Sequence, residues 1–279
     1  MNPEHVLAPL AARYADWLAL PDSAVPSTVD AADGDAVWAM PVILRIERAQ
    51  PPARTALLEA AAAAAVAVCL DPRAQPGEPW HAPLVHWTAR NIRKVARRAR
   101  GAHWSAVQDL DGVTVTVGGA SARALLPGPV DGLPKEVSRL QISGSELPAD
   151  APSAPDPGLP VLWLDPAVTM TAGKAAAQVG HGAMLLATLL AASDAEAELA
   201  GWAEAGFRCA VRTAAPRTWA ALAPAGAPWA AWRDRRVVAV RDAGFTEVAP
   251  GTVTVVAQWP EKFAPALGSD ADAADSGRQ

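Results

Sequence analysis

Apolar and polar positions along the C-terminal half of the chain follow a pattern that predicts strands separated by helices. The run PVLWL (160–164) is apolar throughout, which is typical of a strand buried on both faces. Three further β-rich runs follow, FRCAVR, RRVVAVRD and GTVTVVAQ, and helical stretches precede the second and third strands. The pattern predicts an α/β fold, with helices on both faces of a four-stranded sheet.

The connection between the last two of these strands decides the direction of at least one of them. It consists of DAGFTEVAPG (242–251), which is too short for a helical crossover. We therefore expect one strand to run antiparallel, so that the sheet is mixed.

The N-terminal half has a different pattern. Helical periodicity predicts helices over 5–20, 53–70 and 83–100, and a strand lies within 36–47. The stretch GVTVTVGGASARALL (112–126) predicts two short strands joined by a glycine pair. This half is therefore expected to be α+β, and the sequence shows no internal repeat.

A proline-rich stretch separates the two halves. Residues 148–160 contain five prolines and no apolar period, which indicates an extended linker. This gives an α+β domain over 1–147 and an α/β domain over 161–267. The polar tail, 268–279, is predicted to be disordered.

Composition narrows the class of protein. With 279 residues, 51% of them hydrophobic, the chain can bury one large core or two ordinary ones. A net charge of -5 argues against a basic coat for nucleic acid, although a local basic patch remains compatible with it. Cys69 and Cys209 are far apart, which disfavours a disulfide framework or a cysteine zinc site. The N-terminus does not resemble a signal peptide and no uncharged apolar run is of membrane length, so we expect a cytoplasmic protein with no membrane association.

Three polar side chains interrupt the alanine-rich segment MTAGKAAAQVGHGA (170–183). At 100° per residue, Gln178 and His181 lie within about 40° of Lys174, on one face of a helix. The other faces are apolar, so the polar stripe is expected beside a cleft. A lysine in the first turn opposes the helix dipole by ~0.3–1 kcal/mol, a penalty that is easily tolerated if the ammonium and the helix amides face an anion.

These three residues also fit a structural interpretation, which is the more frequent one for such a trio alone. A lysine in a first turn is usually solvated, and a lone histidine usually packs in a core. A phosphate-binding P-loop is excluded, because Val168 and Ala175 stand where that motif needs Gly and Ser or Thr.

A second group of polar residues lies in RDAGFTEVAPGT (241–252). Asp242 ends a predicted strand, and Thr246 and Thr252 add hydroxyls nearby. Ligands of open α/β sheets bind at the carboxyl ends of strands. If the strands before Lys174 and Asp242 are parallel neighbours, these two residues meet in one crevice. The alternative is that Asp242 only stabilises a turn.

Together, the two segments resemble the second class of peptidyl-tRNA hydrolases, the type best known from archaea and eukaryotes, over about residues 160–260. The resemblance implies a compact domain with a mixed four-stranded sheet and no metal or organic cofactor. It also implies hydrolysis of the ester that joins a peptide to the terminal ribose of tRNA. The residues at the positions of the family's site are Lys174, Gln178, His181, Asp242, Thr246 and Thr252.

The sequence departs from the family at several positions. Asp165 and Ala167 stand where family members usually have an arginine and an aspartate, and the basic start of the second strand is reduced to Arg208. Gly180 and Gly182 replace small residues around the histidine, at a cost of ~0.5–1 kcal/mol each relative to alanine in a helix. The first two changes affect the grip on substrate more than the chemistry.

The residues suggest a mechanism for such an enzyme. An acyl ester is activated, so its hydrolysis needs an oriented water and a stabilised oxyanion more than a covalent nucleophile. We hypothesise that Lys174 and the adjacent helix amides stabilise the oxyanion or the terminal phosphate. Asp242 would hold Lys174 or orient the water, while Thr246 and Thr252 relay hydrogen bonds. His181 is expected to organise the site or contact RNA rather than act as the base.

A cluster of cations in the N-terminal half suggests RNA binding. Residues 90–100 contain six cations, and at helical spacing one face would carry Arg90, Arg93, Lys94 and Arg97. Such a face can bind an RNA backbone, and it could compensate for the reduced basic positions of the second half. The alternative is a solvated surface balanced by acids elsewhere.

The sequence thus predicts a cytoplasmic peptidyl-tRNA hydrolase with tRNA as substrate. The ribosome and a second copy of the chain are further candidate partners. One alternative is a catalytically weakened tRNA- or ribosome-binding protein that keeps the hydrolase fold. Another is an unrelated nucleotide-binding α/β protein, for which the sequence has no glycine fingerprint.

Overall fold

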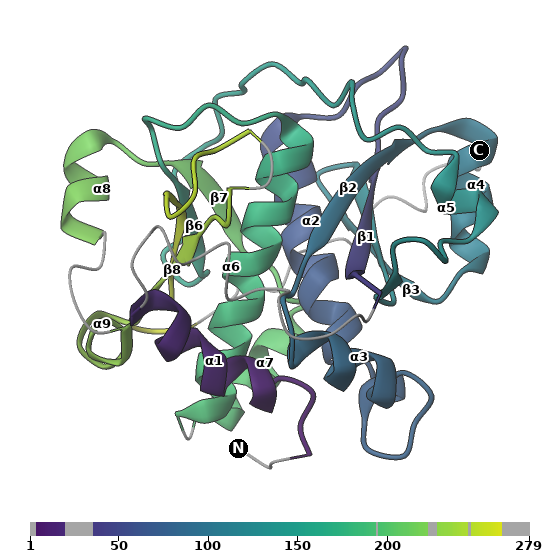
Figure 1. The fold of residues 1–279 in the computed structure, drawn as a ribbon. Helices are drawn as coiled ribbons and strands as arrows, with labels where there is room; N and C mark the ends of the chain where they lie inside the picture. The colour runs from purple at the N-terminus through teal and green to yellow at the C-terminus, as the bar shows by residue number, and fades with distance from the viewer. Residues whose placement is uncertain (1–3, 20–35, 194, 223–227, 245–246, 264–279) are drawn as a thin grey trace, which may run out of the picture.

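The computed structural model describes residues 4–19, 36–193, 195–222, 228–244 and 247–263. They form two mixed sheets and the helices around them, which confirms the α/β class and the preceding α+β region (Figure 1). The elements before residue 148 are α1 (Ala8–Ala19), β1 (Trp38–Arg45), α2 (Arg54–Cys69), η2 (Pro72–Ala74), α3 (His81–Thr88), β2 (Lys94–Ala99), α4 (Gly101–Ala106), η3 (Val107–Asp109), β3 (Gly112–Val117), β4 (Ala120–Leu125), β5 (Gly128–Pro129) and α5 (Lys135–Ser138). Those after residue 160 are β6 (Val161–Leu164), α6 (Ala172–Ala192), α7 (Glu196–Glu204), β7 (Ala210–Thr213), α8 (Pro216–Leu222), α9 (Pro228–Arg235), β8 (Val237–Arg241) and β9 (Val253–Gln258).

The C-terminal sheet is mixed, as the short connection predicts. Its strand order is β7-β6-β9-β8, with β6 parallel to β7, and with β9 antiparallel to both β6 and β8. Strands β6 and β8 are therefore parallel but are separated by β9. Their carboxyl ends still lie at the same edge of the sheet, which is the condition for Lys174 and Asp242 to meet.

The N-terminal sheet repeats this arrangement. Its order is β2-β1-β4-β3, with β1 parallel to β2, and with β4 antiparallel to both β1 and β3. A short β5 is added beside β1. In each sheet the first strand is followed by the long helix, α2 or α6. The chain therefore contains two copies of one topology, a structural repeat that the sequence does not reveal.

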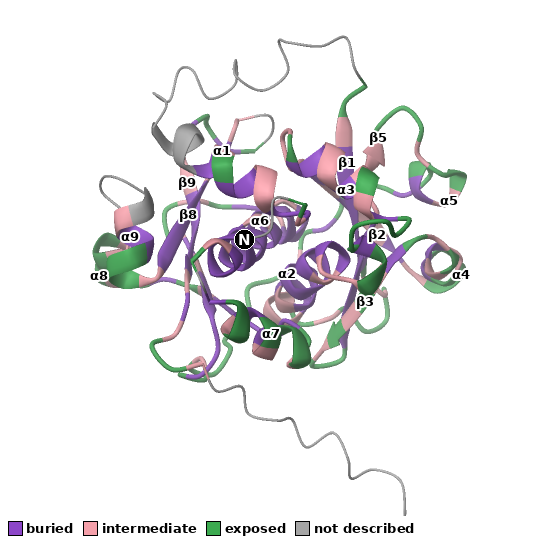
Figure 2. Cartoon of the chain, turned by 90° about the horizontal axis from the view of Figure 1, so that it is seen from below, coloured by how far each residue is buried: buried purple, intermediate pink, exposed green. Residues whose placement is uncertain are grey.

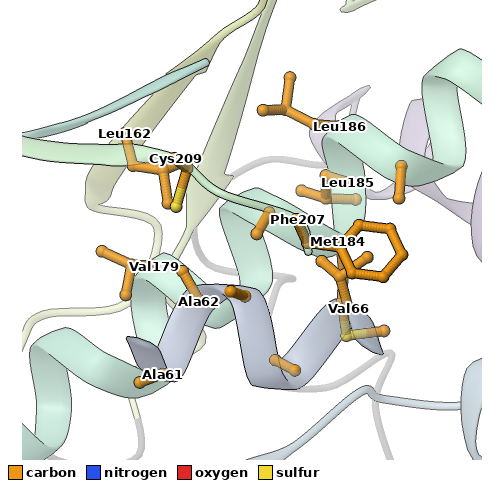
Figure 3. Close-up of a cluster of buried hydrophobic side chains, with 14 of the residues drawn as sticks. Ala61, Ala62, Val66, Leu162, Val179, Met184, Leu185, Leu186, Phe207 and Cys209 are labelled. Carbon is orange, nitrogen blue, oxygen red and sulfur yellow. The ribbon is translucent and has the colours of Figure 1, made fainter. Parts of the chain in front are cut away.

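The two long helices pack against each other between the two sheets, which gives a sheet–helix–helix–sheet arrangement (Figures 1 and 2). Helix α2 also contacts β7 of the other copy, and α6 contacts β2. The alanines of 60–65 have short side chains, so the helix axes can approach closely. Apolar residues of both copies form one buried cluster, with Ala61, Ala62 and Val66 facing Val179 and its neighbours (Figure 3).

Helix α6 is the most apolar of the long elements. By length and composition it could span a membrane, but 89% of the relevant window is buried inside the protein. Its apolar faces are covered by α2 and by both sheets, so its composition is explained by its position in the core.

The basic helix predicted over 83–100 is wrong. Helix α3 ends at Thr88, and residues 94–99 form strand β2, which pairs in parallel with β1. Lys94 and Ala96 are buried and Arg97 points to the other side, as expected for a period of two. The backbone partners of residues 94–99 come from β1, which is distant in the sequence. The local spacing of the arginines does not indicate this pairing.

Smaller corrections concern the region after α6. Ser193 and Glu196 have the spacing of a capping box, but Ser193 follows the last residue of α6, and its hydroxyl donates to the Leu189 carbonyl. Helix α7 has no side-chain cap. Helix α9 was not predicted.

The proline-rich stretch, 148–160, contains neither helix nor strand. It touches both copies, because Asp150 accepts hydrogen bonds from Thr55 at the start of α2 and the Ser153 carbonyl accepts one from Arg212 of β7. The predicted domain boundaries stay a prediction. The tail of 268–279 lies outside the described residues.

Candidate active site

A cavity of about 680 Å³ lies between the two copies, against the first turns of α6. Its wall includes residues from α1, from the loop before β2 and from the edge of the C-terminal sheet. The charged side chains that line it are Arg13, Arg90, Arg93, Lys94, Lys174, Arg241, Asp242 and Glu247. Cations thus outnumber carboxylates in a chain that is acidic overall, which favours an anionic ligand in this cavity.

Lys174 and Asp242 form an ion pair in the cavity wall. Lys174 Nζ lies 2.6 Å from Asp242 Oδ2, and the two side chains are only 11% and 5% exposed. Gln178 Nε2 donates to the same oxygen at 2.7 Å, and Thr254 Oγ1 donates to Gln178 Oε1 at 2.5 Å. Helix α6 and strands β8 and β9 are therefore joined by one chain of hydrogen bonds. With both its amide atoms engaged, Gln178 is held in one orientation.

The backbone after β8 fixes Asp242. Its amide donates to the Thr252 carbonyl, its carbonyl accepts from Gly251, and its Oδ1 accepts from the amide of Gly244 at 2.7 Å. Gly244 has φ +79°, and a Cβ there would lie 2.4 Å from Pro250 Cγ, so this turn requires glycine. The Asx-type turn expected as the alternative is present, and the same carboxylate also holds Lys174.

The first turn of α6 is capped from within the protein. Thr171 Oγ1 accepts from the amide of Lys174, and Ser145 accepts from the amides of Ala172 and Gly173 through its carbonyl and hydroxyl oxygens. Glu247 accepts from both the amide and the hydroxyl of Thr171. These helix amides are already bonded, so the hypothesis that they stabilise an oxyanion is corrected. The ammonium group of Lys174 is left as the candidate for that role.

His181 lines the same cavity and is only partly buried. Its Nδ1 lies 3.2 Å from Nζ of Lys94. Burial, and next the charges of Lys94 and Lys174, hold the pKa of His181 well below its usual value, so the imidazole is neutral at pH 7. A histidine that contacts RNA as a cation is therefore not what this environment favours.

Lys94 is 9% exposed, and burial lowers its pKa to about 7. Its ammonium group lies 4.9 Å from the centre of the Trp87 ring, at a distance typical of a cation–π contact. At neutral pH this lysine is therefore close to half-protonated, unlike a surface lysine.

The two glycines beside His181 make room for neighbours. A Cβ at Gly180 would lie 3.1 Å from Lys94 Cδ and 3.3 Å from Ala65 Cβ. A Cβ at Gly182 would lie 3.2 Å from Val255, in the sheet below. Each glycine lowers helix propensity but allows α6 to pack closely on one side.

The cations predicted to share one helical face are divided by the strand. Arg90, Arg93 and Lys94 line the cavity. Arg97 lies on the opposite side of β2, where its guanidinium donates to the carbonyl of Leu140 at 2.8 Å. Arg97 thus stabilises the packing of the α5 region and does not face the cavity.

Two threonines, Thr246 and Thr252, were also predicted to belong to the site. Thr246 lies outside the described residues. Thr252 accepts the Asp242 amide through its backbone and does not line the cavity. The threonine in the polar network is instead Thr254, a fully buried residue of β9, and a hydroxyl within the apolar run VTVVA could have indicated it.

Asp165 and Ala167, the two departures from the family pattern, form a turn in which the Asp165 carboxylate accepts from the Ala167 amide at 2.8 Å. Neither residue lines the cavity. The described part of the chain has no group of three or more His, Cys, Asp or Glu side chains placed to hold a metal ion. Its two cysteines are buried free thiols.

Comparison with known families agrees with this geometry. Residues 161–264 match the family model of peptidyl-tRNA hydrolase PTH2, which confirms the resemblance seen over 160–260. The match includes Lys174, Gln178, His181 and Asp242, and it leaves residues 1–160 outside. No curated protein and no solved structure matches the chain significantly.

Proposed function

We propose that the chain hydrolyses the ester bond between a peptide, or an N-blocked amino acid, and tRNA. The observation that carries the proposal is the buried ion pair of Lys174 and Asp242, which faces a cation-lined cavity within the segment that matches the PTH2 family. Buried ionisable pairs in a cavity are typical of catalytic sites.

In the proposed reaction, water attacks the ester carbonyl carbon and the bond to the ribose oxygen breaks. The peptide leaves as a carboxylate, and the ribose hydroxyl regains a proton. An ammonium group carries three hydrogens, so Lys174 can hold Asp242 and also donate to the oxyanion that develops on the carbonyl. Three donors bind the carboxylate of Asp242, which suits it to orienting Lys174 and Gln178.

The cations of the cavity suit the phosphates of the tRNA terminus. Arg90 and Arg93 come from the N-terminal copy and Arg241 from the end of β8. Arginine binds phosphate oxygens in a bidentate geometry, and such contacts supply affinity rather than sequence specificity. A cytoplasmic location and the ribosome or a second copy as partners are further parts of this proposal.

The test is release of tRNA from N-acetylated aminoacyl-tRNA by the purified chain. Lys174→Ala should lower kcat/KM by roughly 100-fold or more, as is usual when an oxyanion donor is lost. Lys135 is exposed on α5, away from the cavity, so Lys135→Ala is a matched control and should keep wild-type turnover.

Two outcomes would contradict the proposal. Wild-type turnover by Lys174→Ala would remove this lysine from the mechanism. Tight tRNA binding by the wild-type chain without ester hydrolysis would instead favour a weakened tRNA-binding protein that keeps the fold.

A further inference from the structure

A lysine from the N-terminal copy reaches the candidate active site of the C-terminal copy. Lys94 starts strand β2, and its methylene groups pass over Gly180 of α6. Its Nζ lies 3.2 Å from Nδ1 of His181. The stem of Lys94 therefore lies in the space beside Gly180, where a larger residue of α6 would place its side chain.

The surroundings of Lys94 are unusual for a lysine. Of the described residues, no carboxylate forms an ion pair with it, and its other polar neighbour is the Ile92 carbonyl at 3.4 Å. Burying an ammonium group without a counter-charge is costly. A lysine kept in such a place needs a use that an apolar residue could not serve, and His181 provides the polar side-chain atom within hydrogen-bond distance of its Nζ.

We propose that Lys94 is a positioning residue that donates a hydrogen bond to Nδ1 of His181 and thereby fixes the imidazole with its proton on Nε2. This inference rests on the proposed hydrolase function. Both the ammonium and the neutral amine of lysine carry N–H groups, so this bond forms in either protonation state. His181 then offers a hydrogen-bond donor to the substrate in the cavity and does not act as the general base.

The repeat supports a dedicated role for this contact. The strand registers that place Leu44 opposite Arg98 and Leu164 opposite Thr213 make Cys209 the equivalent of Lys94. Counted from the N-caps of the two long helices, the equivalent of His181 is Ala63. The lysine–histidine contact therefore has no counterpart at the equivalent pair, Cys209 and Ala63; on that side, α2 and β7 are joined instead by the ion pair of Glu59 with Arg212.

The charge of Lys94 should also affect binding, since its pKa is lowered to about 7 by burial. The ionisable groups around it are Cys69 of α2, and His181 with Lys174 behind it on α6. Below neutral pH the ammonium adds one positive charge to the cavity, and this charge is lost as the pH rises. The advantage of wild type over a Lys94→Met variant should therefore shrink from pH 6 to pH 8.

The first test does not depend on activity. The imidazole of His181 is followed by NMR during a pH titration in wild type, in Lys94→Met and in the control Lys135→Met. Loss of Lys94 removes one of the causes that depress the His181 pKa, so this pKa should rise toward 6.5 in Lys94→Met alone. An unchanged pKa would overturn the contact, even if the chain proved to have no hydrolase activity.

The second test asks whether Lys94 acts through His181. In ester hydrolysis, Lys94→Met and His181→Phe should each lower kcat by about 10-fold, and the double variant should be no worse than either. Gly180→Ala, which crowds the lysine stem, should lower kcat in the same direction while both functional side chains remain. Multiplicative losses in the double variant would overturn the positioning role, and a constant ratio of wild type to Lys94→Met across pH 6–8 would overturn the effect of the Lys94 charge on binding.

Discussion

The two copies of the fold differ most at the positions that carry chemistry. Each copy has a parallel strand pair, an antiparallel hairpin and a long helix that packs on its twin. Counted from the N-caps, the third and seventh helical residues are Lys174 and Gln178 in α6, but Ala56 and Ala60 in α2. One helix therefore presents an ammonium and an amide where the other presents methyl groups.

The hairpins differ in the same way. When Leu44 is aligned with Leu164, the pairing registers align Ala120, opposite Val117, with Val253, opposite Arg241, so Gly118 is the equivalent of Asp242. A Cβ at Gly118 would lie 3.5 Å from Ala56 Cβ, so the N-terminal copy has small apolar residues where the C-terminal copy has an ion pair. The two copies thus share a topology and a helix core, while the side chains of the proposed reaction are present in the C-terminal copy.

The N-terminal copy nevertheless contributes to the site. It supplies Arg90, Arg93 and Lys94 to the cavity wall, and its Ser145 caps the helix that carries Lys174. A copy without a counterpart of the Lys174–Asp242 pair can thus serve the other copy as a wall and as a source of charge.

Breaking the ion pair should affect the C-terminal site in two separable ways. Asp242→Leu leaves the Lys174 ammonium buried without its partner, which should lower the free energy of unfolding by about 2–4 kcal/mol and abolish activity. Adding Lys174→Met should restore most of the stability and none of the activity. Urea unfolding together with tRNA release checks both. Full destabilisation in the double variant would show that the pair is mainly structural.

Replacing Lys94, the buried lysine of the N-terminal copy, should raise the free energy of unfolding, whereas replacing Asp242 should lower it. The pKa of Lys94 is lowered from 10.5 to about 7, so between these values the unfolded chain binds more protons and wild-type stability rises with pH. Lys94→Met avoids this cost and should be more stable at pH 7 by roughly 2–4 kcal/mol, given about 1.4 kcal/mol per pKa unit. The difference should diminish toward pH 10. A Lys94→Met variant that is less stable at pH 7 would contradict this.

Arg93, which directly precedes β2, and Arg97, which lies within it, should behave differently because their side chains have different surroundings. Arg93 lines the cavity, so Arg93→Ala should raise KM and reduce the salt slope of tRNA binding by about one. Arg97 binds the Leu140 carbonyl instead, so Arg97→Ala should leave that slope unchanged and lower the thermal midpoint by a few degrees. Equal salt slopes in the two variants would show that a place in the cavity wall does not decide which cation meets RNA.

The sequence predicted the C-terminal half well for a physical reason. The buried strand before Lys174 and the β-branched run before Asp242 each have a strong local signal, and the rule for carboxyl ends of strands brought the two residues together even though β9 lies between. Thr254 was not predicted, because its position within the apolar run of β9 resembles an ordinary β-branched core residue and its partner, Gln178, lies on a distant helix.

The N-terminal half was less predictable because its pattern depends on distant pairing. Strand β2 was mistaken for a helix, since its arginines have helical spacing and its partner β1 lies about 50 residues earlier. The repeat was invisible in the sequence because alanine and glycine stand in the N-terminal copy at the positions of the polar residues that mark the C-terminal copy. The contact of Lys94 with His181 joins two such distant elements, so no local pattern indicated it.

The most direct test of the central claim is the single-turnover rate of ester hydrolysis by Asp242→Asn with N-acetylated aminoacyl-tRNA already bound. Asparagine keeps the size of the side chain but removes the charge that holds Lys174. If Asp242 acts by holding Lys174 in place for the oxyanion, the rate should fall by about 100-fold with little change in the Kd for tRNA. A rate equal to that of wild type would contradict this role.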